Sequence, residues 1–393
     1  MGPAVPVPQD RFHRTIWYVT TGLMNPFIYS RPVEPAELVD RDAEGQQLIE
    51  LAEAGHAVRL SAPRRYGKTS LLYRVRDDAR AVGMRCVYVD LWGAVSVADL
   101  ADTVEEAYRR ELKGPIRNAA VAVIRALRPT LRAAPGGVGA EVSPDVDAEP
   151  GRRLRGLLDL PLKLFERDGV RTLVIFDEFQ ELLRTGNSLD AIVRGRIQHH
   201  GSAASYIYSG SHLGLMEQLF GRRERPLFGQ AQPLYLAPLS DPDLAEYVGA
   251  RFDGTGRDPG EALERLLDFA GGHPQRAMML AHRLWDLTPS KGRAQLEDFE
   301  RALDAVRDEV HEAMGATWNA LASVERRVIS ALARSDHALL SDRTLSRRFE
   351  LVKSSAQEAR DRLIKSGDLQ RTEGGPVIVD PLLADYARRF ASE

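Results

Sequence analysis

The chain has little cysteine and no long apolar run. Cys86 is the one cysteine among 393 residues, so an intrachain disulfide is impossible and a zinc site built from several cysteines is excluded. No stretch approaches the ~18 uninterrupted apolar residues of a membrane-spanning helix, and the first residues lack the apolar segment of a secretion signal. A soluble, cytoplasmic protein that does not bind membranes is therefore expected.

The chain also lacks an excess of charge of one sign. Lys and Arg number 53 and Asp and Glu 56, so the net charge of −3 indicates no general attraction to nucleic acid or anionic lipid. Six of the 53 cations are lysines, which makes the place of each lysine informative. A hydrophobic share of 44% is ordinary for a globular protein and excludes a largely disordered chain.

Short apolar strands alternate with helical segments over the first 240 residues. The strands are expected at 56–62, 86–91, 171–179, 205–211 and 232–239. The helices between them are expected at 69–83, 97–131, 152–168 and 188–200. Such alternation is typical of parallel βαβ units, so the sequence predicts an α/β fold in which helices cover both faces of a parallel sheet.

The pattern changes twice further along the chain. After residue 240 helices alone are expected, and near the C-terminus Gly374-Gly375 between short apolar runs predicts a hairpin. Within the first part, alternating Val and Ala at 135–151 predicts a small hairpin insertion. The predicted division is an N-terminal extension at 1–24, an α/β core at 25–240, a helical domain at 241–312 and a third domain at 313–393.

The turn between the first strand and the next helix nearly matches the phosphate-loop pattern G-x-x-x-x-G-K-[ST], with Ala62 at the first glycine position. Gly67 tolerates the positive φ that turns backbone N–H groups inward, Lys68 can reach the terminal phosphates and Thr69 can coordinate Mg²⁺. The alternative is a turn that binds nothing. The sequence predicts binding of ATP or ADP with Mg²⁺, and the predicted loop residues are Ala62, Pro63, Arg64, Arg65, Tyr66, Gly67, Lys68, Thr69 and Ser70.

An acidic pair follows the most apolar strand of the chain. Asp177 and Glu178 come directly after Leu-Val-Ile-Phe, at the edge of a parallel sheet where ligands bind. Asp177 is predicted to hold Mg²⁺, and Glu178 to orient or deprotonate an attacking water. The alternative is that one acid caps the following helix.

Residues after the fourth strand are candidates for contacts with the terminal phosphate. Ser209 and Ser211 are candidate sensors, although a plain Ser-Gly-Ser turn explains them equally well. Arg222 and Arg223 lie in the arginine-rich segment that follows and are candidate arginine fingers. Solvated loop arginines are the alternative, since the chain holds 47 of them.

The C-terminal region looks like a winged helix-turn-helix. Its expected parts are a helix at 324–334, a short helix at 344–349, a recognition helix at Lys353–Ser366 and a wing at 369–380. Residues 317–393 carry 13 basic and 11 acidic side chains, a weak electrostatic footprint for duplex DNA, so docking of a protein partner or oligomerisation stays open. The candidate DNA contacts are Lys353, Ser354, Ser355, Gln357 and Arg360.

With these motifs in view, the sequence resembles the archaeal-type ATPases of the STAND-related branch of AAA+ P-loop proteins. The likeness covers nearly the whole chain. Its most specific segments are PRRYGKTSLL at 63–72 and LVIFDEFQELL at 173–183. The other matching segments are NPF at 25–27, YIYSGSH at 206–212, the LF, PLF and APLS run at 219–240, GGHPQRAMMLAHRL at 271–284 and DPLLADYARRF at 380–390.

The resemblance implies an ATPase core, a helical lid and a winged helix, with ATP binding controlling assembly into a homo-oligomer or contact with a partner. It also makes Gly272, His273 and Pro274 candidates to contact the nucleotide, although a helix stop followed by a helix start explains the same residues. Besides Ala62, one departure matters. Gln230 stands where an arginine is expected, so hydrolysis is expected to be slow or to need an arginine from elsewhere.

Three functions remain open from the sequence. The first is an ATP-hydrolysing switch that works by nucleotide-dependent assembly or engagement of DNA. The second is a regulatory module that holds ADP or ATP tightly and turns it over little. The third is a DNA-binding module, either origin-recognition-like or a transcriptional regulator in which the winged helix has the main role. Asp177-Glu178 beside Lys68-Thr69 favours hydrolysis over pure binding.

Overall fold

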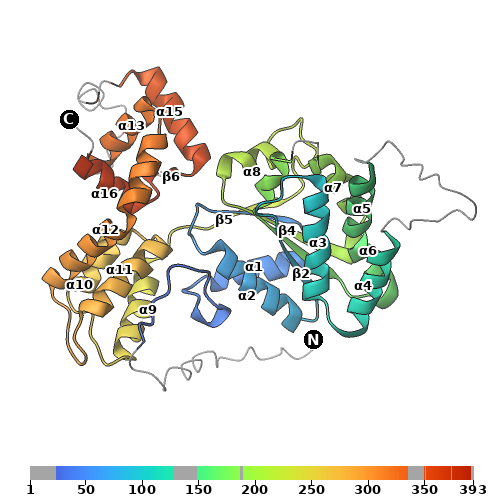
Figure 1. Cartoon of the computed structure of the whole chain (residues 1–393), viewed down its shortest axis with the longest axis horizontal. Helices are drawn as coiled ribbons and strands as arrows, with labels where there is room; N and C mark the ends of the chain where they lie inside the picture. Colours follow the sequence, from blue (N-terminus) through green and yellow to red (C-terminus); the bar gives the residue numbers. More distant parts are fainter. Residues whose placement is uncertain are drawn as a thin grey trace, which may run out of the picture. The chain divides into compact units, whose positions relative to one another are not determined.

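The structure, a computed structural model, describes residues 24–127, 148–185, 189–334, 349, 351–372 and 374–390. The predicted N-terminal extension, the 135–151 hairpin and the short helix at 344–349 lie wholly or mostly outside the described residues. The chain divides into two compact units, whose elements are labelled in Figure 1. Of the described residues, those within Arg41–Ala237 and Ser354–Val379 form the sheet unit, and those within Met1–Asp40, Pro238–Lys353 and Asp380–Glu393 form the helical unit.

A five-stranded parallel sheet forms the middle of the sheet unit. Its strands are β1 (Val58–Ser61), β2 (Arg85–Asp90), β3 (Thr172–Asp177), β4 (Ala204–Gly210) and β5 (Gln232–Tyr235), in the order β2-β3-β4-β1-β5. The predicted α/β fold is therefore confirmed. Because every neighbouring pair is parallel, the strands end along one side of the sheet, here called the carboxyl edge, where Asp90 stands opposite Asp177.

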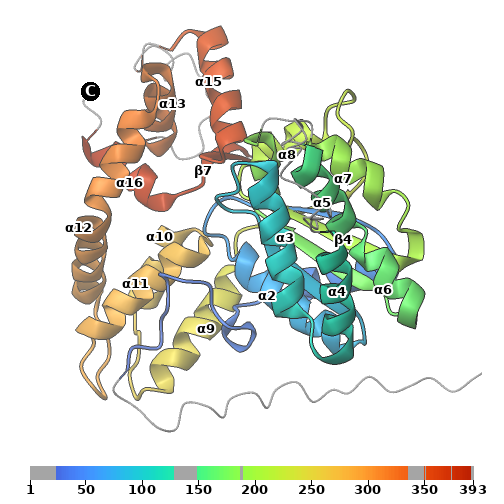
Figure 2. The ribbon, with the colours of Figure 1, turned by 45° about the vertical axis from the view of Figure 1, so that its right-hand side comes forward.

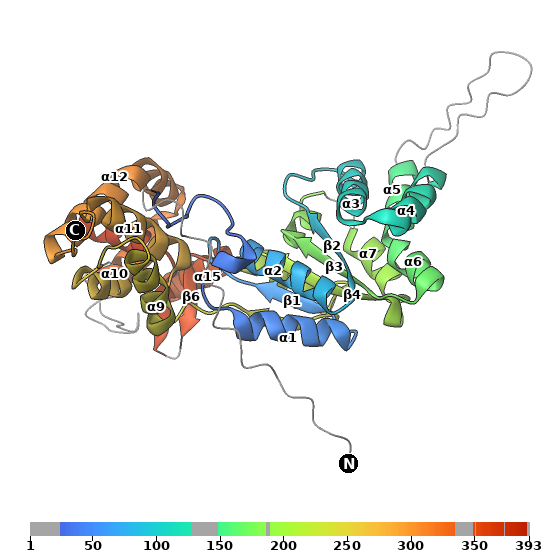
Figure 3. The same cartoon turned by 90° about the horizontal axis from the view of Figure 1, so that it is seen from below.

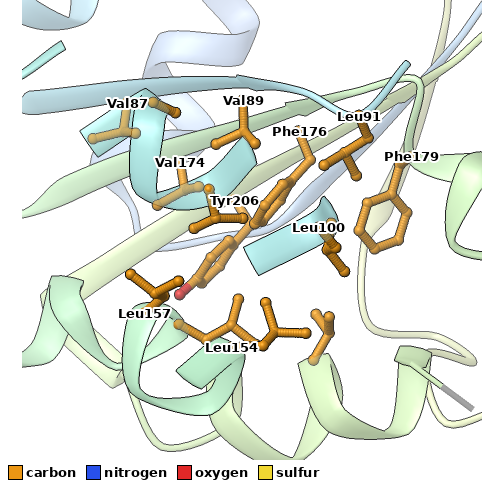
Figure 4. Packing of buried hydrophobic residues seen from close by; sticks show 14 of the residues in the cluster. Val87, Val89, Leu91, Leu100, Leu154, Leu157, Val174, Phe176, Phe179 and Tyr206 are labelled. Atoms are coloured by element: carbon orange, nitrogen blue, oxygen red, sulfur yellow. The ribbon is translucent and has the colours of Figure 1, made fainter. Parts of the chain in front are cut away.

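Helices cover both faces of this sheet (Figure 3). One face carries α1 (Asp42–Glu53) and α2 (Lys68–Ala81), and the other carries α3 (Val97–Glu111), α4 (Gly114–Ala126), α5 (Ala148–Leu158), α6 (Leu160–Asp168) and α7 (Leu189–Ile197). Alternate strand residues serve the two faces, as expected for a pleated strand. Tyr88 of β2 packs edge-on against Tyr73 of α2, whereas Val87 and Val89 turn to the other face and pack with Phe176 in the main core (Figure 4).

Two of the segments predicted as helical each form two helices. The segment predicted from residue 97 forms α3 and α4, which are separated where Gly114 has a φ of +58° and a proline follows it. The segment 152–168 breaks at Asp159, because Pro161 lacks the N–H that a continuing helix needs and is tolerated only in the first turn of α6. The remaining elements are η2 (Phe179–Leu183), η3 (Gly201–Ala203), α8 (Leu213–Phe220), α15 (Lys353–Ser366), β6 (Leu369–Thr372) and β7 (Gly375–Ile378).

The helical unit is built almost entirely from α-helices, as predicted for the chain after residue 240 (Figure 2). Its elements are η1 (Pro35–Glu37), α9 (Asp241–Asp253), α10 (Ala262–Ala270), α11 (Pro274–Leu287), α12 (Leu296–Ala320), α13 (Ser323–Arg334) and α16 (Pro381–Phe390). The α12 helix runs through residues 312 and 313, where a domain boundary is predicted. Within the described part of the chain, no helix is both long and apolar enough to cross a membrane.

The Asn25-Pro26-Phe27 segment packs on α11 within the helical unit. Asn25 Nδ2 donates to the carbonyl of His282 at 2.9 Å, and the ring of His282 bonds through Nδ1 to the carbonyl of Phe27 at 2.8 Å. Phe27 is 1% exposed and its ring lies 5.5 Å from that of Phe252 on α9. This short N-terminal motif therefore joins two helices of the unit.

Candidate functional site

The predicted phosphate loop lies between β1 and α2 at the carboxyl edge of the sheet. Gly67 adopts the left-handed conformation with φ +80° and immediately precedes α2, and an added Cβ would meet no atom within 4 Å. Glycine is therefore needed there for its backbone and not for space. Ala62 is buried and its φ is not positive, which explains why alanine fits the first position of the pattern. Arg64 and Arg65, within the loop, are exposed.

Asp177 is buried where the phosphate loop approaches β3. Its Oδ2 accepts hydrogen bonds from Thr69 Oγ1 at 3.1 Å and from the Tyr88 hydroxyl at 2.8 Å, and its Oδ1 accepts the N–H of Glu178 at 3.0 Å. Burial raises the pKa of Tyr88 and the charge of Asp177 raises it further, so the phenol stays a donor. The Thr69 hydroxyl and the Asp177 carboxylate lie side by side and are oxygen ligands of the kind Mg²⁺ takes. These two residues therefore fit this ion.

Glu178 lies beside the loop lysine. Its Oε1 is 3.8 Å from Lys68 Nζ, and its Oε2 accepts hydrogen bonds from Ser211 Oγ at 2.7 Å and from Gln180 Nε2. The Lys68 side chain is 6% exposed, and a buried ammonium needs an anion nearby. Glu178 supplies that anion here, and it does so from an uncommon left-handed backbone conformation with φ +50°.

The two candidate sensor serines differ in their contacts. Ser211 contacts Glu178, as above, whereas Ser209 is fully buried and its Oγ has no hydrogen-bond partner among the described residues. The sensor role of both serines stays a prediction.

The arginine candidates lie apart from these contacts. Arg222 and Arg223 are exposed after α8, and Arg225 forms an ion pair at 3.0 Å with Asp190, whose side chain is 3% exposed. Arg225 therefore has a structural partner, and the finger role of Arg222 and Arg223 stays a prediction. Gln230 is exposed and donates to the carbonyl of Phe228 at 3.2 Å.

Gly272, His273 and Pro274 belong to the helical unit, where each has a local structural role. Gly272 has a φ of +75°, and an added Cβ would lie 2.4 Å from the carbonyl oxygen of Leu239. His273 is 2% exposed and caps α11, with its Nδ1 accepting the N–H of Arg276 at 3.4 Å. Pro274 is the first residue of α11. Their contact with a nucleotide stays a prediction.

The candidate DNA residues gather at the start of α15. The helix has the predicted bounds, and β6 pairs antiparallel with β7 in the region predicted as a wing. Four of the five candidates are exposed: Lys353, Ser354, Ser355 and Gln357. Arg360 is half-buried and pairs with Asp361 at 3.5 Å. The helix and hairpin are present, while the winged-helix assignment and the DNA contacts stay predictions.

Two residues that contact the acidic pair are absent from the sequence prediction, namely Tyr88 and Gln180. Tyr88 reaches Asp177 because β2 and β3 are neighbours, a pairing that the order of strands along the chain does not reveal. Gln180 reaches Glu178 because η2 turns the chain back immediately after β3. No local sequence signal distinguishes either residue from an ordinary strand or helix position.

Comparisons with known proteins agree with this fold. The sequence profile of an AAA-like domain matches residues 31–103, well under half of the chain. No curated protein matches the sequence. The structure of the Walker-type ATPase PABY2304 of Pyrococcus abyssi is similar with a TM-score of 0.64 and 18% identity over 91% of this chain and 99% of that one.

A second solved structure is the Aeropyrum pernix ORC2 protein in ADPNP–ADP complexes. Its TM-score is 0.55 and its identity 16%, and the match covers 91% of this chain and 94% of that one. At such low identities the likeness establishes the fold, which is that of an α/β P-loop ATPase followed by a helical C-terminal region.

Proposed function

We propose that this chain binds ATP with Mg²⁺ and hydrolyses it, and that its nucleotide state controls assembly of copies or engagement of a partner or duplex DNA. One observation carries the proposal. Lys68 Nζ lies 3.8 Å from Glu178 Oε1, and Thr69 Oγ1 lies 3.1 Å from Asp177 Oδ2 at the end of β3. Thr69 and Asp177 are 108 residues apart in the sequence. An amine, a hydroxyl and two carboxylates at this edge form the set that phosphoryl transfer from a nucleotide requires.

Each of these residues has a distinct task in the proposed reaction. Lys68 binds the terminal phosphates, and the backbone turned by Gly67 directs N–H groups at them. Thr69 and Asp177 hold Mg²⁺, which when bound offsets negative charge on the phosphates. Glu178 accepts a proton from water, the water oxygen bonds to the terminal phosphorus, and the bond from that phosphorus to ADP breaks, which yields ADP and phosphate.

A module that holds nucleotide with little turnover is the second candidate, and one observation favours it. Glu178 is engaged by Lys68, Ser211 and Gln180 in this structure, so the carboxylate must exchange the lysine for water before it can act as a base. Arg225 is committed to an ion pair with Asp190. Both features support slow turnover, whereas the completeness of the acidic pair supports hydrolysis as the main proposal.

Calorimetric titration of ATP and a phosphate-release assay test the proposal. Lys68→Ala is expected to abolish Mg²⁺-dependent ATP binding, and Glu178→Gln to keep binding but lose turnover by about 10²-fold or more. Lys163→Ala and Glu166→Gln, both at exposed positions on α6, are the matched controls and are expected to behave as wild type. A wild-type chain without ATP affinity would contradict the whole proposal, and tight binding without measurable turnover would leave the second candidate.

Light scattering after size exclusion tests the switch. The runs contain ADP, ATP or a non-hydrolysable analogue, each with and without duplex DNA. A mass increase with ATP alone supports assembly of copies of this chain, and an increase that needs DNA supports engagement through α15, where Lys353 is an exposed cation. DNA binding through so few charges is expected to depend only weakly on salt. Identical masses in all runs would exclude both forms of the switch.

A further inference from the structure

Gln180 contacts the acidic pair from a position that the sequence left without a role. It lies in η2 directly after β3 and is 3% exposed. Its Nε2 donates to Glu178 Oε2, the same oxygen that receives Ser211 Oγ. The other oxygen of Glu178, Oε1, is the one that lies 3.8 Å from Lys68 Nζ. The two oxygens therefore have separate partners, and the plane of the carboxylate is defined by both.

The side-chain amide of Gln180 can face this carboxylate in one orientation. An ionised carboxylate only accepts hydrogen bonds, so the amide must present its NH₂ group. That orientation leaves Gln180 Oε1 buried without a hydrogen-bond partner among the described residues. An unpartnered buried amide oxygen weakens a fold. The residue is thus placed for its contact with Glu178 at the expense of stability, as is common at functional sites.

Gly210 provides the space that this amide occupies. A Cβ added to Gly210, at the end of β4, would lie 2.5 Å from Gln180 Oε1 and 2.5 Å from Met216 Sδ. Any larger residue at 210 would displace the amide, the methionine or both. The Ser-Gly-Ser segment therefore does more than turn the chain, because its glycine admits Gln180 and its second serine donates to Glu178.

We propose that Gln180 is a positioning residue, which together with Ser211 fixes Glu178 Oε2 and so directs Oε1 towards the phosphate loop. The inference rests on the proposed function, in which Glu178 is the base. Once Lys68 engages phosphate, Oε1 is the oxygen available to accept a proton from water. Gln180 itself contacts neither water nor nucleotide, and its effect passes entirely through Glu178.

Steady-state kinetics of Gln180→Met test this role. Methionine keeps the length of the side chain but cannot donate to Glu178, and it also removes the unpartnered oxygen. We expect kcat to fall by about 10- to 100-fold, as for a misdirected catalytic group, with KM and ATP affinity unchanged and the melting temperature not lowered. Gln198→Met makes the same chemical change at an exposed position and is expected to leave kcat as in wild type.

A double-mutant cycle separates positioning from an independent effect. In the Glu178→Gln background, Gln180→Met is expected to cause no further loss, because its target is already removed. Gln180→Asn withdraws the amide by one methylene and is expected to repeat the kcat loss, which keeps the test valid if the methionine variant does not fold. Gly210→Ala is also expected to lower kcat, because its methyl group displaces the Gln180 amide. Gly195→Ala, at an open helical position, is its control.

The outcomes distinguish this inference from the proposed function. Wild-type kcat in both Gln180 variants, with turnover lost in Glu178→Gln, would overturn the positioning role and leave the ATPase proposal intact. A further loss from Gln180→Met in the Glu178→Gln background would also overturn it, since the glutamine would then act by another route. Wild-type turnover in Glu178→Gln would overturn both proposals.

Discussion

Replacement of Asp380 by asparagine is expected to weaken the helical unit strongly. Arg276 on α11 is 1% exposed, and its Nε and Nη2 donate to the two carboxylate oxygens of Asp380 at 3.0 and 2.6 Å. Asp380 Oδ1 also accepts the N–H of Leu382 in the first turn of α16 at 3.0 Å. The ion pair therefore joins α11 to α16, and Asp380→Asn would leave a guanidinium buried without its counter-charge.

The size of the effect follows from the burial of the two partners. Removal of one member of a buried ion pair costs about 3–5 kcal/mol of stability. The Asp380 side chain is 23% exposed, so water compensates in part, and we expect a loss of about 3 kcal/mol, at the lower end of that range. The double replacement Arg276→Met/Asp380→Asn removes both charges and is expected to recover most of the loss.

The dependence on pH gives a second, independent expectation. Burial alone raises the pKa of Asp380, but the hydrogen bond and charge of Arg276 outweigh it and hold the pKa below its ordinary value of 3.8. Because the folded chain has the lower pKa, the ion pair stabilises the fold fully above pH 3.8 and loses that contribution as the pH falls through the lowered value. Asp380→Asn should differ from wild type at neutral pH and approach it in acid.

Hydrogen exchange of the backbone amides in α11 and α16 measures the stability loss locally, without requiring both units to unfold in one step. Asp304→Asn is the control, because Asp304 pairs with Arg307 at 2.9 Å but its side chain is 69% exposed, and such pairs contribute only about 0–1 kcal/mol. Equal losses of protection in the Asp380 and Asp304 variants would refute the reasoning. So would a double replacement no more stable than Asp380→Asn alone.

Three further changes probe the carboxyl edge of the sheet. Burial and the charges of Asp177 and Glu178 raise the pKa of Asp90, in spite of a hydrogen bond from a backbone N–H. In urea unfolding, Asp90→Asn should therefore stabilise the chain at neutral pH and lose that advantage below about pH 3.8. A variant less stable than wild type at pH 7 would contradict this. Tyr88→Phe removes a hydrogen bond to the buried Asp177 carboxylate. It should lower stability by about 1.5–3 kcal/mol and weaken Mg²⁺-dependent ATP binding in calorimetry. Wild-type stability and ATP affinity would show that Tyr88 does not orient Asp177. The added methyl group of Gly67→Ala meets no neighbour, but the alanine must adopt a left-handed backbone. Its melting temperature should reflect a stability loss of about 1–2 kcal/mol and not the larger cost of a steric clash. A melting temperature as high as that of wild type would mean that the loop is not held in that conformation.

The strands were predictable because a parallel sheet is buried on both faces. Segments such as Leu173–Phe176 are therefore uninterrupted apolar runs, which are typical of a buried parallel strand. Helix ends were less predictable, since apolar periodicity continues across short breaks. Pro161 had to be recognised as part of the first turn of α6 and not of the interior of a longer helix. The return of Ser354–Val379 to the unit that contains the sheet depends on tertiary packing, which periodicity does not report.

The candidate site shows the same division between local and long-range information. The loop residues around Lys68 form a local pattern, and Asp177 follows a strand end, so both could be named from the sequence. Their mutual contacts depend on the strand order, which places β3 between β2 and β4 and so allows Tyr88 to reach Asp177. The contact of Gln180 with Glu178 depends on a left-handed residue and a 3₁₀ turn, neither of which has a sequence signature here.

The single cysteine makes the chain suitable for site-specific labelling. Cys86 lies within β2 and is 2% exposed, and burial raises the pKa of its thiol to about 12. Since the thiolate is the species that reacts with maleimides, the native cysteine should stay unlabelled while the protein is folded. A cysteine introduced at the exposed Ser354 would accept a fluorophore without any prior removal of Cys86, and the dye would report directly on whatever approaches the start of α15.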